Sequence, residues 1–366
     1  MTGGTGEGPR RPGPGDWLGL TRRGIRLGAA LSRAAGPEGV RIATTPKDEV
    51  WRDGKITLCR YRPEAERRLG PVLVLQGLFG RQTVTDLAPG RSLVRRLLQA
   101  GVDVWVLDWG SPTRADRLND MTDYAEYWLG DAIAAIRGET GRRAVPLGIC
   151  QGGVFALCHA ARHPESVAGL ILAVTPVDFH ADMAAGDPAR AGLLNHWVRS
   201  LGPDLIDAVL AERGNLPGAL SGAVFEQLSP ARSALKYGAD LMALADDPDA
   251  LDTFLRMEAW LADRPDHPGA AAREWLVDLY CRNALVRGAF RIEGAPVDLS
   301  RVAAPVLNIV ARDDHIVPPA CCHALEGLTS GPYRALEVPT GHIGVFVSSR
   351  ARALVPAEIA AWLAGA

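Results

Sequence analysis

Residues 146–157, "PLGICQGGVFAL", predict a sharp turn between a buried strand and a helix. Gly148 and Gly152 stand two positions before and two positions after Cys150, in the pattern G-x-nucleophile-x-G. Small residues at these positions let a strained turn close against neighbouring strands, so that the central side chain projects at the top of a sheet. Cys150 is therefore a candidate nucleophile. The alternative is a buried structural cysteine beside a tight turn.

The chain on both sides of this turn alternates between strand patterns and helix patterns. Short apolar runs predict buried strands at 71–76, 102–110, 144–149 and 168–176, and the sheet pattern returns at 304–319 and 333–342. Helical spacing predicts helices at 90–101, from Asn119 or Asp120 to about Arg137 with Gly138 as the stop, at 151–163 and at 356–365. Asp53-Gly54 predicts a hairpin turn. The alternation predicts an α/β fold with a mostly parallel central sheet and helices on both faces.

Three regions follow from this pattern. Residues 1–38 begin with a run rich in Gly and Pro, which predicts a disordered or loosely attached segment without the apolar core of a signal peptide. Residues 39–177 and 293–366 carry the α/β pattern. Residues 178–292 have helical spacing and predict a helical insertion that caps the sheet.

The composition excludes several classes of function. A net charge of −2 over 366 residues gives no electrostatic reason to bind nucleic acid, and no apolar run is long enough to predict a transmembrane segment. Six cysteines without a metal-binding or redox spacing indicate a reduced, cytoplasmic protein. Motifs for a metal or a dinucleotide cofactor are absent from the sequence, so none is expected.

Partners for Cys150 follow it in the order nucleophile, acid, histidine, which is the order of an α/β-hydrolase fold. Asp313 and Asp314 follow an apolar run, and spacing alone leaves the choice between them open. His342 lies in a loop after the next predicted strand. His315 competes with it, but a histidine directly after the acid cannot readily bond to that acid and also reach the nucleophile.

The remaining candidates are less specific. An oxyanion hole needs two backbone N–H groups, and we expect them from Gln151, directly after the nucleophile, and from the loop after 71–76, near Phe79. An ordinary turn is the alternative for that loop. Cys158 is expected in the core. The other histidines are expected to be structural or exposed, and they are His159, His163, His180, His196, His267 and His323.

These residues resemble the polyhydroxyalkanoate synthases, specifically the short class III catalytic subunit, from about residue 40 to the C-terminus. The resemblance is carried by the segments at 86–117, 148–153, 174–180, 297–319 and 341–348, which include "GICQGG", "DDHIVPP" and "GHIGVFVS". It implies that Cys150 is the nucleophile, that Asp314 rather than Asp313 is the catalytic aspartate, and that His342 is the base.

The resemblance also implies an activity. The family polymerises (R)-3-hydroxyacyl groups from coenzyme A into polyester, and the class III type favours short acyl units and works with a second, non-catalytic subunit. It therefore implies a cytoplasmic enzyme at the surface of polyester granules, as a homodimer or hetero-oligomer. The loop "QGLFGRQTV" at 76–84 departs from the family pattern, which puts acyl preference and polymerase competence in question more than the triad.

A thiol suits this reaction, because attack on a thioester gives a second thioester that stays activated towards a hydroxyl. Two alternatives remain at this point. One is a hydrolase with the same triad, such as an intracellular polyester depolymerase or a thioesterase. The other is a non-catalytic granule-associated protein that retains the fold.

Overall fold

The computed structural model describes residues 22–30, 32, 39–184, 192–227 and 244–365. The chain divides into two compact units, one formed by Met1–Arg41 with Ser229–Ala259 and the other by Ile42–Leu228 with Trp260–Ala366. Residues 22–30 are helical, whereas most of the predicted N-terminal segment 1–38 lies outside the described residues.

The larger unit is built on an eight-stranded sheet in the order β1-β2-β6-β3-β7-β8-β11-β12. Its strands are β1 (Lys47–Asp53), β2 (Ile56–Tyr61), β3 (Leu69–Gln76), β6 (Val102–Asp108), β7 (Val145–Ile149), β8 (Leu170–Ala173), β11 (Val306–Ala311) and β12 (Tyr333–Val338). The six strands β6, β3, β7, β8, β11 and β12 are parallel to one another. At one edge of the sheet β2 pairs antiparallel with β6, and β1 pairs antiparallel with β2. The predicted mostly parallel sheet is confirmed.

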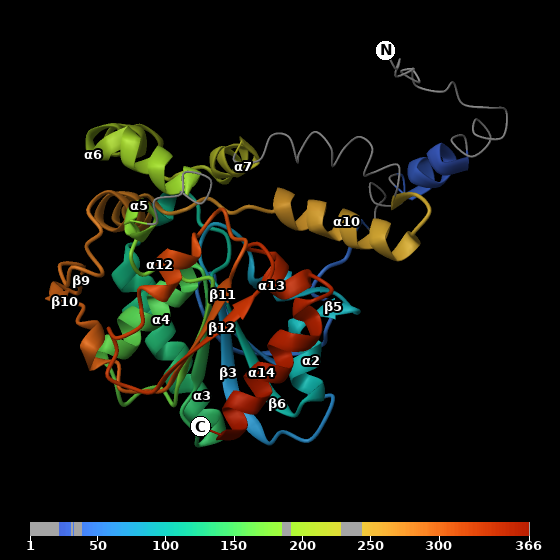
Figure 1. The fold of residues 1–366 in the computed structure, drawn as a ribbon, viewed down its shortest axis with the longest axis horizontal. Coiled ribbons are helices and arrows are strands. Elements are labelled where there is room, and N and C mark those ends of the chain that lie inside the picture. The colour runs from blue at the N-terminus through green and yellow to red at the C-terminus, as the bar shows by residue number, and fades with distance from the viewer. Residues whose placement is uncertain (1–21, 31, 33–38, 185–191, 228–243, 366) are drawn as a thin grey trace, which may run out of the picture. The chain divides into compact units, whose positions relative to one another are not determined.

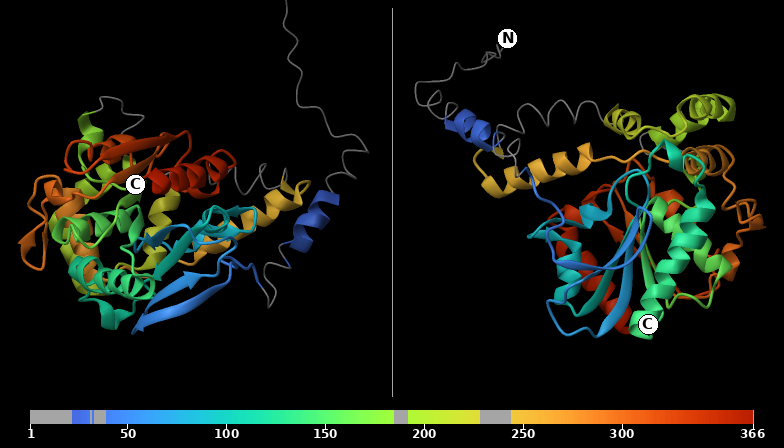
Figure 2. Two further views of the ribbon diagram at one scale, coloured as in Figure 1. Left: turned by 90° about the horizontal axis from the view of Figure 1, so that it is seen from below. Right: turned by 180° about the vertical axis from the view of Figure 1, so that it is seen from behind.

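Helices cover both faces of this sheet (Figures 1 and 2). On one face α4 (Gln151–Arg162) packs on β7, β3 and β8, with α3 (Leu129–Thr140) and the π-helical segment η3 (Asp123–Trp128) beside it. On the other face α2 (Leu93–Gln99) and α14 (Ala351–Gly365) pack against each other and against the central strands. The central strands are buried on both faces, which explains their continuous apolar sequences.

Two glycine predictions had different outcomes. Gly54 has a φ of 53° and turns the chain between β1 and β2, so the predicted hairpin is confirmed. The prediction that Gly138 ends a helix is wrong. α3 continues to Thr140 and ends at Gly141, whose φ of 67° supplies the left-handed cap. A helix tolerates an internal glycine at a cost of about 1 kcal/mol, and Gly138 is such a residue.

The described part of 178–292 is mainly helical. Its helices are α5 (Ala181–Ala184), α6 (Leu193–Arg213), α7 (Gly218–Gln227), α10 (Pro248–Ala262), α11 (Gly269–Arg273) and the π-helical η4 (Glu274–Cys281). At its end β9 (Arg291–Ile292) pairs with β10 (Ala295–Pro296). A role for this region as a cap stays a prediction. None of the helices among the described residues combines the length and apolar content needed to cross a membrane.

Short elements complete the larger unit. They are η1 (Gln82–Thr85), β4 (Asp86–Ala88), β5 (Arg91–Ser92), η2 (Arg114–Asp116), η5 (Leu299–Arg301), α12 (Pro319–His323) and α13 (Gly344–Val347). α12 and α13 follow the loops after β11 and β12, at the carboxyl end of the parallel strands. Parallel α/β sheets place their functional side chains at this end.

Candidate active site

Cys150 occupies a strained turn between β7 and α4. Its backbone has φ 53° and ψ −119°, a conformation that L residues adopt only when the surrounding structure enforces it. The glycines on either side leave the necessary space. A Cβ atom on Gly148 would lie 2.4 Å from Cα of Gly153, and one on Gly152 would lie 2.6 Å from the carbonyl oxygen of Leu75. The predicted elbow is therefore present, and it needs glycine on both sides of the cysteine.

Asp314 and His342 meet at the same end of the sheet. Asp314 follows β11 and His342 follows β12, and Oδ2 of the aspartate lies 2.7 Å from Nδ1 of the histidine. The other carboxylate oxygen accepts the N–H groups of Ile316 and Val317, at 2.9 and 3.0 Å. These bonds fix the carboxylate in one orientation. The side chain of Cys150 is close enough to His342 to influence its charge.

The structure distinguishes the two candidate aspartates. Asp314 is 6% exposed and faces His342. The side chain of Asp313 is 58% exposed and lies 3.4 Å from the Arg312 guanidinium. Of the two candidates, Asp314 is therefore the one that lies against an imidazole. His342, rather than His315, is the histidine that pairs with this carboxylate and interacts with Cys150.

His342 is held in an environment that favours its charged form. Burial disfavours the imidazolium, but the Asp314 carboxylate and the Cys150 side chain outweigh burial and raise the pKa of His342 to about 10. Cys150 also stands at the N-terminus of α4, where the helix dipole stabilises negative charge. A cysteine beside a histidine that is held in its charged form is an arrangement found in enzymes that attack acyl groups.

The two candidate N–H groups for an oxyanion hole belong to separate elements. Gln151 begins α4, and Phe79 lies in the loop after β3. Within the described chain, neither N–H forms a hydrogen bond. The neighbouring N–H of Leu78 is occupied, because it donates to Oε1 of Gln151 at 2.8 Å. Gln151 and Phe79 thus remain the candidates for an oxyanion hole.

The side chain of Gln151 and the ring of His267 form a contact that the sequence did not reveal. Nε2 of Gln151 lies 3.0 Å from Nε2 of His267, although 116 positions separate the two residues. His267 was expected to be structural or exposed; its side chain is buried against the elbow. No local motif signals such a contact.

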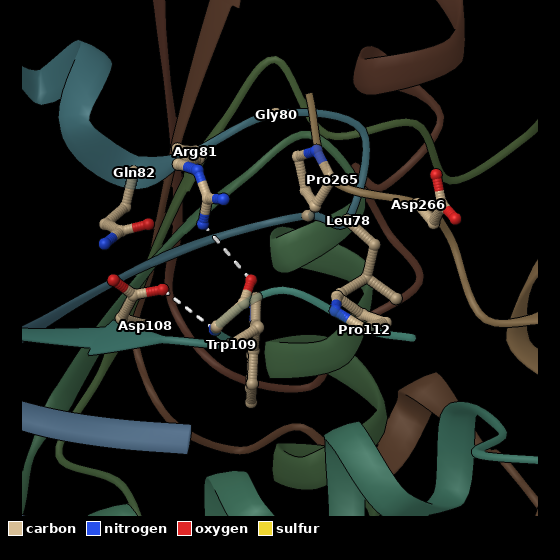
Figure 3. Close-up of a pocket in the computed structure, with 11 residues that line it drawn as sticks. Leu78, Gly80, Arg81, Gln82, Asp108, Trp109, Pro112, Pro265 and Asp266 are labelled. Atoms are coloured by element: carbon tan, nitrogen blue, oxygen red, sulfur yellow. Dashed lines mark hydrogen bonds between the residues drawn. The ribbon is translucent and has the colours of Figure 1, made fainter. Parts of the chain in front are cut away.

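The loop that carries Phe79 lines a small pocket together with Asp108, Trp109 and Pro112 (Figure 3). Nε1 of Trp109 donates to the carbonyl of Gln76 at 2.7 Å, and Nε1 of Trp260 donates to the carbonyl of Arg81 at 2.8 Å. The pocket beside these residues has a volume of about 10 Å³, which is the room of one water molecule. It is too small for an acyl group.

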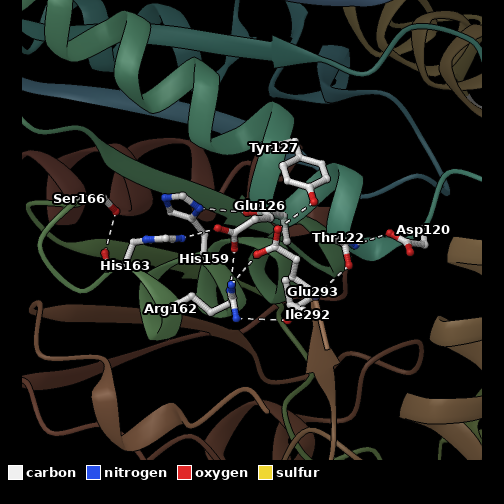
Figure 4. A network of polar contacts seen from close by, with 11 residues as sticks. Asp120, Thr122, Glu126, Tyr127, His159, Arg162, His163, Ser166, Ile292 and Glu293 are labelled. Carbon is white, nitrogen blue, oxygen red and sulfur yellow. Dashed lines mark hydrogen bonds and ion pairs between the residues drawn. The ribbon is translucent and has the colours of Figure 1, made fainter. Parts of the chain in front are cut away.

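A second polar cluster lies away from Cys150 (Figure 4). Glu126 pairs with His163 and with Arg162, and the side chains of Glu126, His159 and His163 lie close enough to share a metal ion. The guanidinium of Arg162, 2.8 Å from the same carboxylate, opposes a second cation there. Arg162 also reaches Glu293 at 2.9 Å, so this network ties η3 and α4 to the segment after β9.

Comparison with known proteins agrees with the fold. The sequence profile described as the alpha/beta hydrolase fold matches residues 70–349. The poly(3-hydroxyalkanoate) polymerase subunit PhaC of Allochromatium vinosum is 38% identical over 92% of this chain and 94% of its own length. The subunit of the same name from Thiocystis violacea is 34% identical over 92% of this chain and 93% of its own.

A solved structure shows the same fold at much lower identity. It is a thermostable carboxyl esterase from Bacillus coagulans, in complex with glycerol. The two chains superpose with a TM-score of 0.51 at 14% identity, over 87% of this chain and 98% of the esterase. The predicted α/β-hydrolase fold is confirmed.

Proposed function

The chain belongs to the poly(3-hydroxyalkanoate) polymerase family of α/β-hydrolase-fold acyltransferases, and on that premise we propose that it polymerises (R)-3-hydroxyacyl-CoA into polyester with release of coenzyme A. One observation carries the proposal: at the carboxyl end of the sheet His342 is hydrogen-bonded to Asp314 and interacts with Cys150, which stands on the strained turn after β7. A thiol nucleophile matches a thioester substrate, because each exchange keeps the acyl group activated.

In the first step the Cys150 thiolate attacks the carbonyl carbon of the acyl-CoA. The tetrahedral oxyanion is stabilised by the N–H groups of Gln151 and Phe79. The bond from this carbon to the coenzyme A sulfur then breaks, and His342 supplies the proton that the departing thiolate takes up. The product is an acyl thioester on Cys150.

In the second step a 3-hydroxyl group of another hydroxyacyl unit attacks this thioester. His342 accepts the hydroxyl proton, the new ester bond forms, and the bond to the Cys150 sulfur breaks. Asp314 orients His342 and stabilises its cation in both steps. The helical residues of 178–292 are proposed to exclude water, which would otherwise compete with the hydroxyl.

Finer features of this activity follow the class III resemblance. We propose a preference for short acyl units such as 3-hydroxybutyryl, without any bound cofactor. The same proposal includes cooperation with a second, non-catalytic synthase subunit and assembly as a homodimer or hetero-oligomer. It also includes action at the granule surface in the cytoplasm.

Purified protein and (R)-3-hydroxybutyryl-CoA provide the test, alone and with a candidate second subunit. Release of coenzyme A with formation of insoluble polyester supports the proposal. Release of coenzyme A with free hydroxy acid and no polymer would instead establish the hydrolase alternative. The Cys150→Ala variant is the control: if it releases coenzyme A as fast as the wild type, the mechanism is wrong. A protein that releases none would be the non-catalytic alternative.

A further inference from the structure

A buried series of three hydrogen bonds joins the loop after β3, the start of α4 and the segment 267–268. The N–H of Leu78 donates to Oε1 of Gln151 at 2.8 Å. Nε2 of Gln151 lies 3.0 Å from Nε2 of His267, and Nδ1 of His267 lies 3.2 Å from the carbonyl oxygen of Pro268. Gln151 is 0% exposed and His267 is 1% exposed, so water does not replace any of these bonds.

The direction of each bond follows from the first one. The N–H of Leu78 can only donate, so the amide oxygen of Gln151 faces it and the amide NH₂ faces His267. Nε2 of His267 must then accept, which places the ring hydrogen on Nδ1, where it donates to Pro268. Burial lowers the pKa of His267 to about 4 and so keeps the ring neutral, as this tautomer requires.

His267 itself has a fixed position. Its backbone N–H and carbonyl both pair with Leu216, at 2.9 Å each. Its ring lies against Phe79, with 4.7 Å between the ring centroids. The histidine therefore contacts both halves of the proposed oxyanion hole, one through the Gln151 amide and the other through the Phe79 ring.

We propose that His267 is a positioning residue for acyl transfer: its Nε2 lone pair fixes the Gln151 amide, which holds the Leu78–Phe79 backbone against the start of α4. This fixes the separation of the Gln151 and Phe79 N–H groups. If the amide rotated by half a turn, its NH₂ would face the Leu78 N–H and the loop would lose its hydrogen bond. The inference rests on the proposed function, because the oxyanion forms only during acyl transfer.

The test compares His267→Leu, which removes the acceptor, with His267→Gln, whose amide oxygen can restore it. Both are assayed for kcat and KM with (R)-3-hydroxybutyryl-CoA, and for the rate at which iodoacetamide alkylates Cys150. Alkylation forms no oxyanion, so it reports the thiolate alone. We expect His267→Leu to lower kcat about tenfold, a smaller loss than the roughly 10²- to 10³-fold loss for removing an oxyanion donor outright, with KM and alkylation within about twofold of wild type. His267→Gln should recover most of kcat.

Matched controls separate positioning from folding. His196→Leu removes an exposed histidine on α6 and should change none of these rates. Gln151→Met breaks the same series from its other end, which keeps the test informative if His267→Leu does not fold. The double variant that combines His267→Leu with Gln151→Met should lose no more kcat than Gln151→Met alone, because both substitutions act on one series of bonds.

Four results would overturn the inference. They are an unchanged kcat in His267→Leu, a fall in alkylation as large as the fall in kcat, losses that multiply in the double variant, and no recovery in His267→Gln. If the wild type itself releases no coenzyme A, the proposed function fails and this inference fails with it. That outcome is distinct from an active wild type with an unaffected His267→Leu.

Discussion

Oδ2 of Asp314 lies 2.7 Å from Nδ1 of His342, although the two residues are 28 positions apart in the chain. β11 and β12 are adjacent and parallel, so the loops that follow them lie side by side at one edge of the sheet. The bond leaves Nε2 of the imidazole for Cys150, and it determines which tautomer a neutral His342 adopts. The reactivity of the proposed nucleophile therefore depends on this one carboxylate, which acts through the orientation and tautomer of His342.

Asp314→Asn should lower the rate of coenzyme A release by about 10²-fold to 10⁴-fold, because an amide stabilises the wrong tautomer of His342 and no longer stabilises its cation. Asp313→Asn is the matched control: its side chain is 58% exposed, and its rate should stay within about twofold of wild type. Equal losses in the two variants would contradict the assignment of Asp314. The measurement is the initial rate of coenzyme A release.

Cys150→Ser should lower kcat by at least about 10²-fold and keep the fold. A hydroxyl is a weaker nucleophile than a thiolate, and its oxygen ester is less activated towards the next hydroxyl than a thioester is. Mass spectrometry of protein quenched during turnover should find the acyl group on Cys150 in the wild type. An acyl group on another residue would contradict the mechanism.

The unfolding free energy should fall as pH rises from 7 to 10. The pKa of His342 is raised from 6.5 to about 10 in the folded protein, so its contribution to stability is complete below 6.5 and is lost as pH rises through 10. The slope from one such group is at most about 1.4 kcal/mol per pH unit. Urea unfolding across this range should show a steeper decline in the wild type than in His342→Gln. Parallel declines would show that the histidine is not held charged.

Gly148→Ala should destabilise the protein by about 1–3 kcal/mol or more, because the new methyl group would lie 2.4 Å from Cα of Gly153 and the backbone would have to move. Gly138→Ala is the control within α3, where a Cβ meets nothing within 4 Å. It should raise stability by up to about 1 kcal/mol. Urea unfolding midpoints measure both. Equal stability of the two variants would mean that the elbow does not need glycine at 148.

The local sequence predicted most of the sheet. Continuous apolar runs such as "PVLVLQ" lie on β3, and the glycines around Cys150 predicted the elbow, because both features act over a few neighbouring residues. Helix ends were less well predicted. Gly138 and Gly141 lie within one turn of each other, and only the backbone conformation shows that Gly141 is the cap.

The sequence alone determined the fold class, the elbow and the order of nucleophile, acid and histidine, because chain order and short apolar patterns can be read directly from the sequence. Spacing could not choose between Asp313 and Asp314. The resemblance favoured Asp314, and only the tertiary structure shows that Asp314 is the one buried against His342, because burial depends on how β11 meets its neighbours. Contact between Gln151 and His267 was decided by the tertiary structure alone. A hydrogen bond across 116 positions leaves no periodicity or motif in the sequence, because it exists only once separate segments pack together.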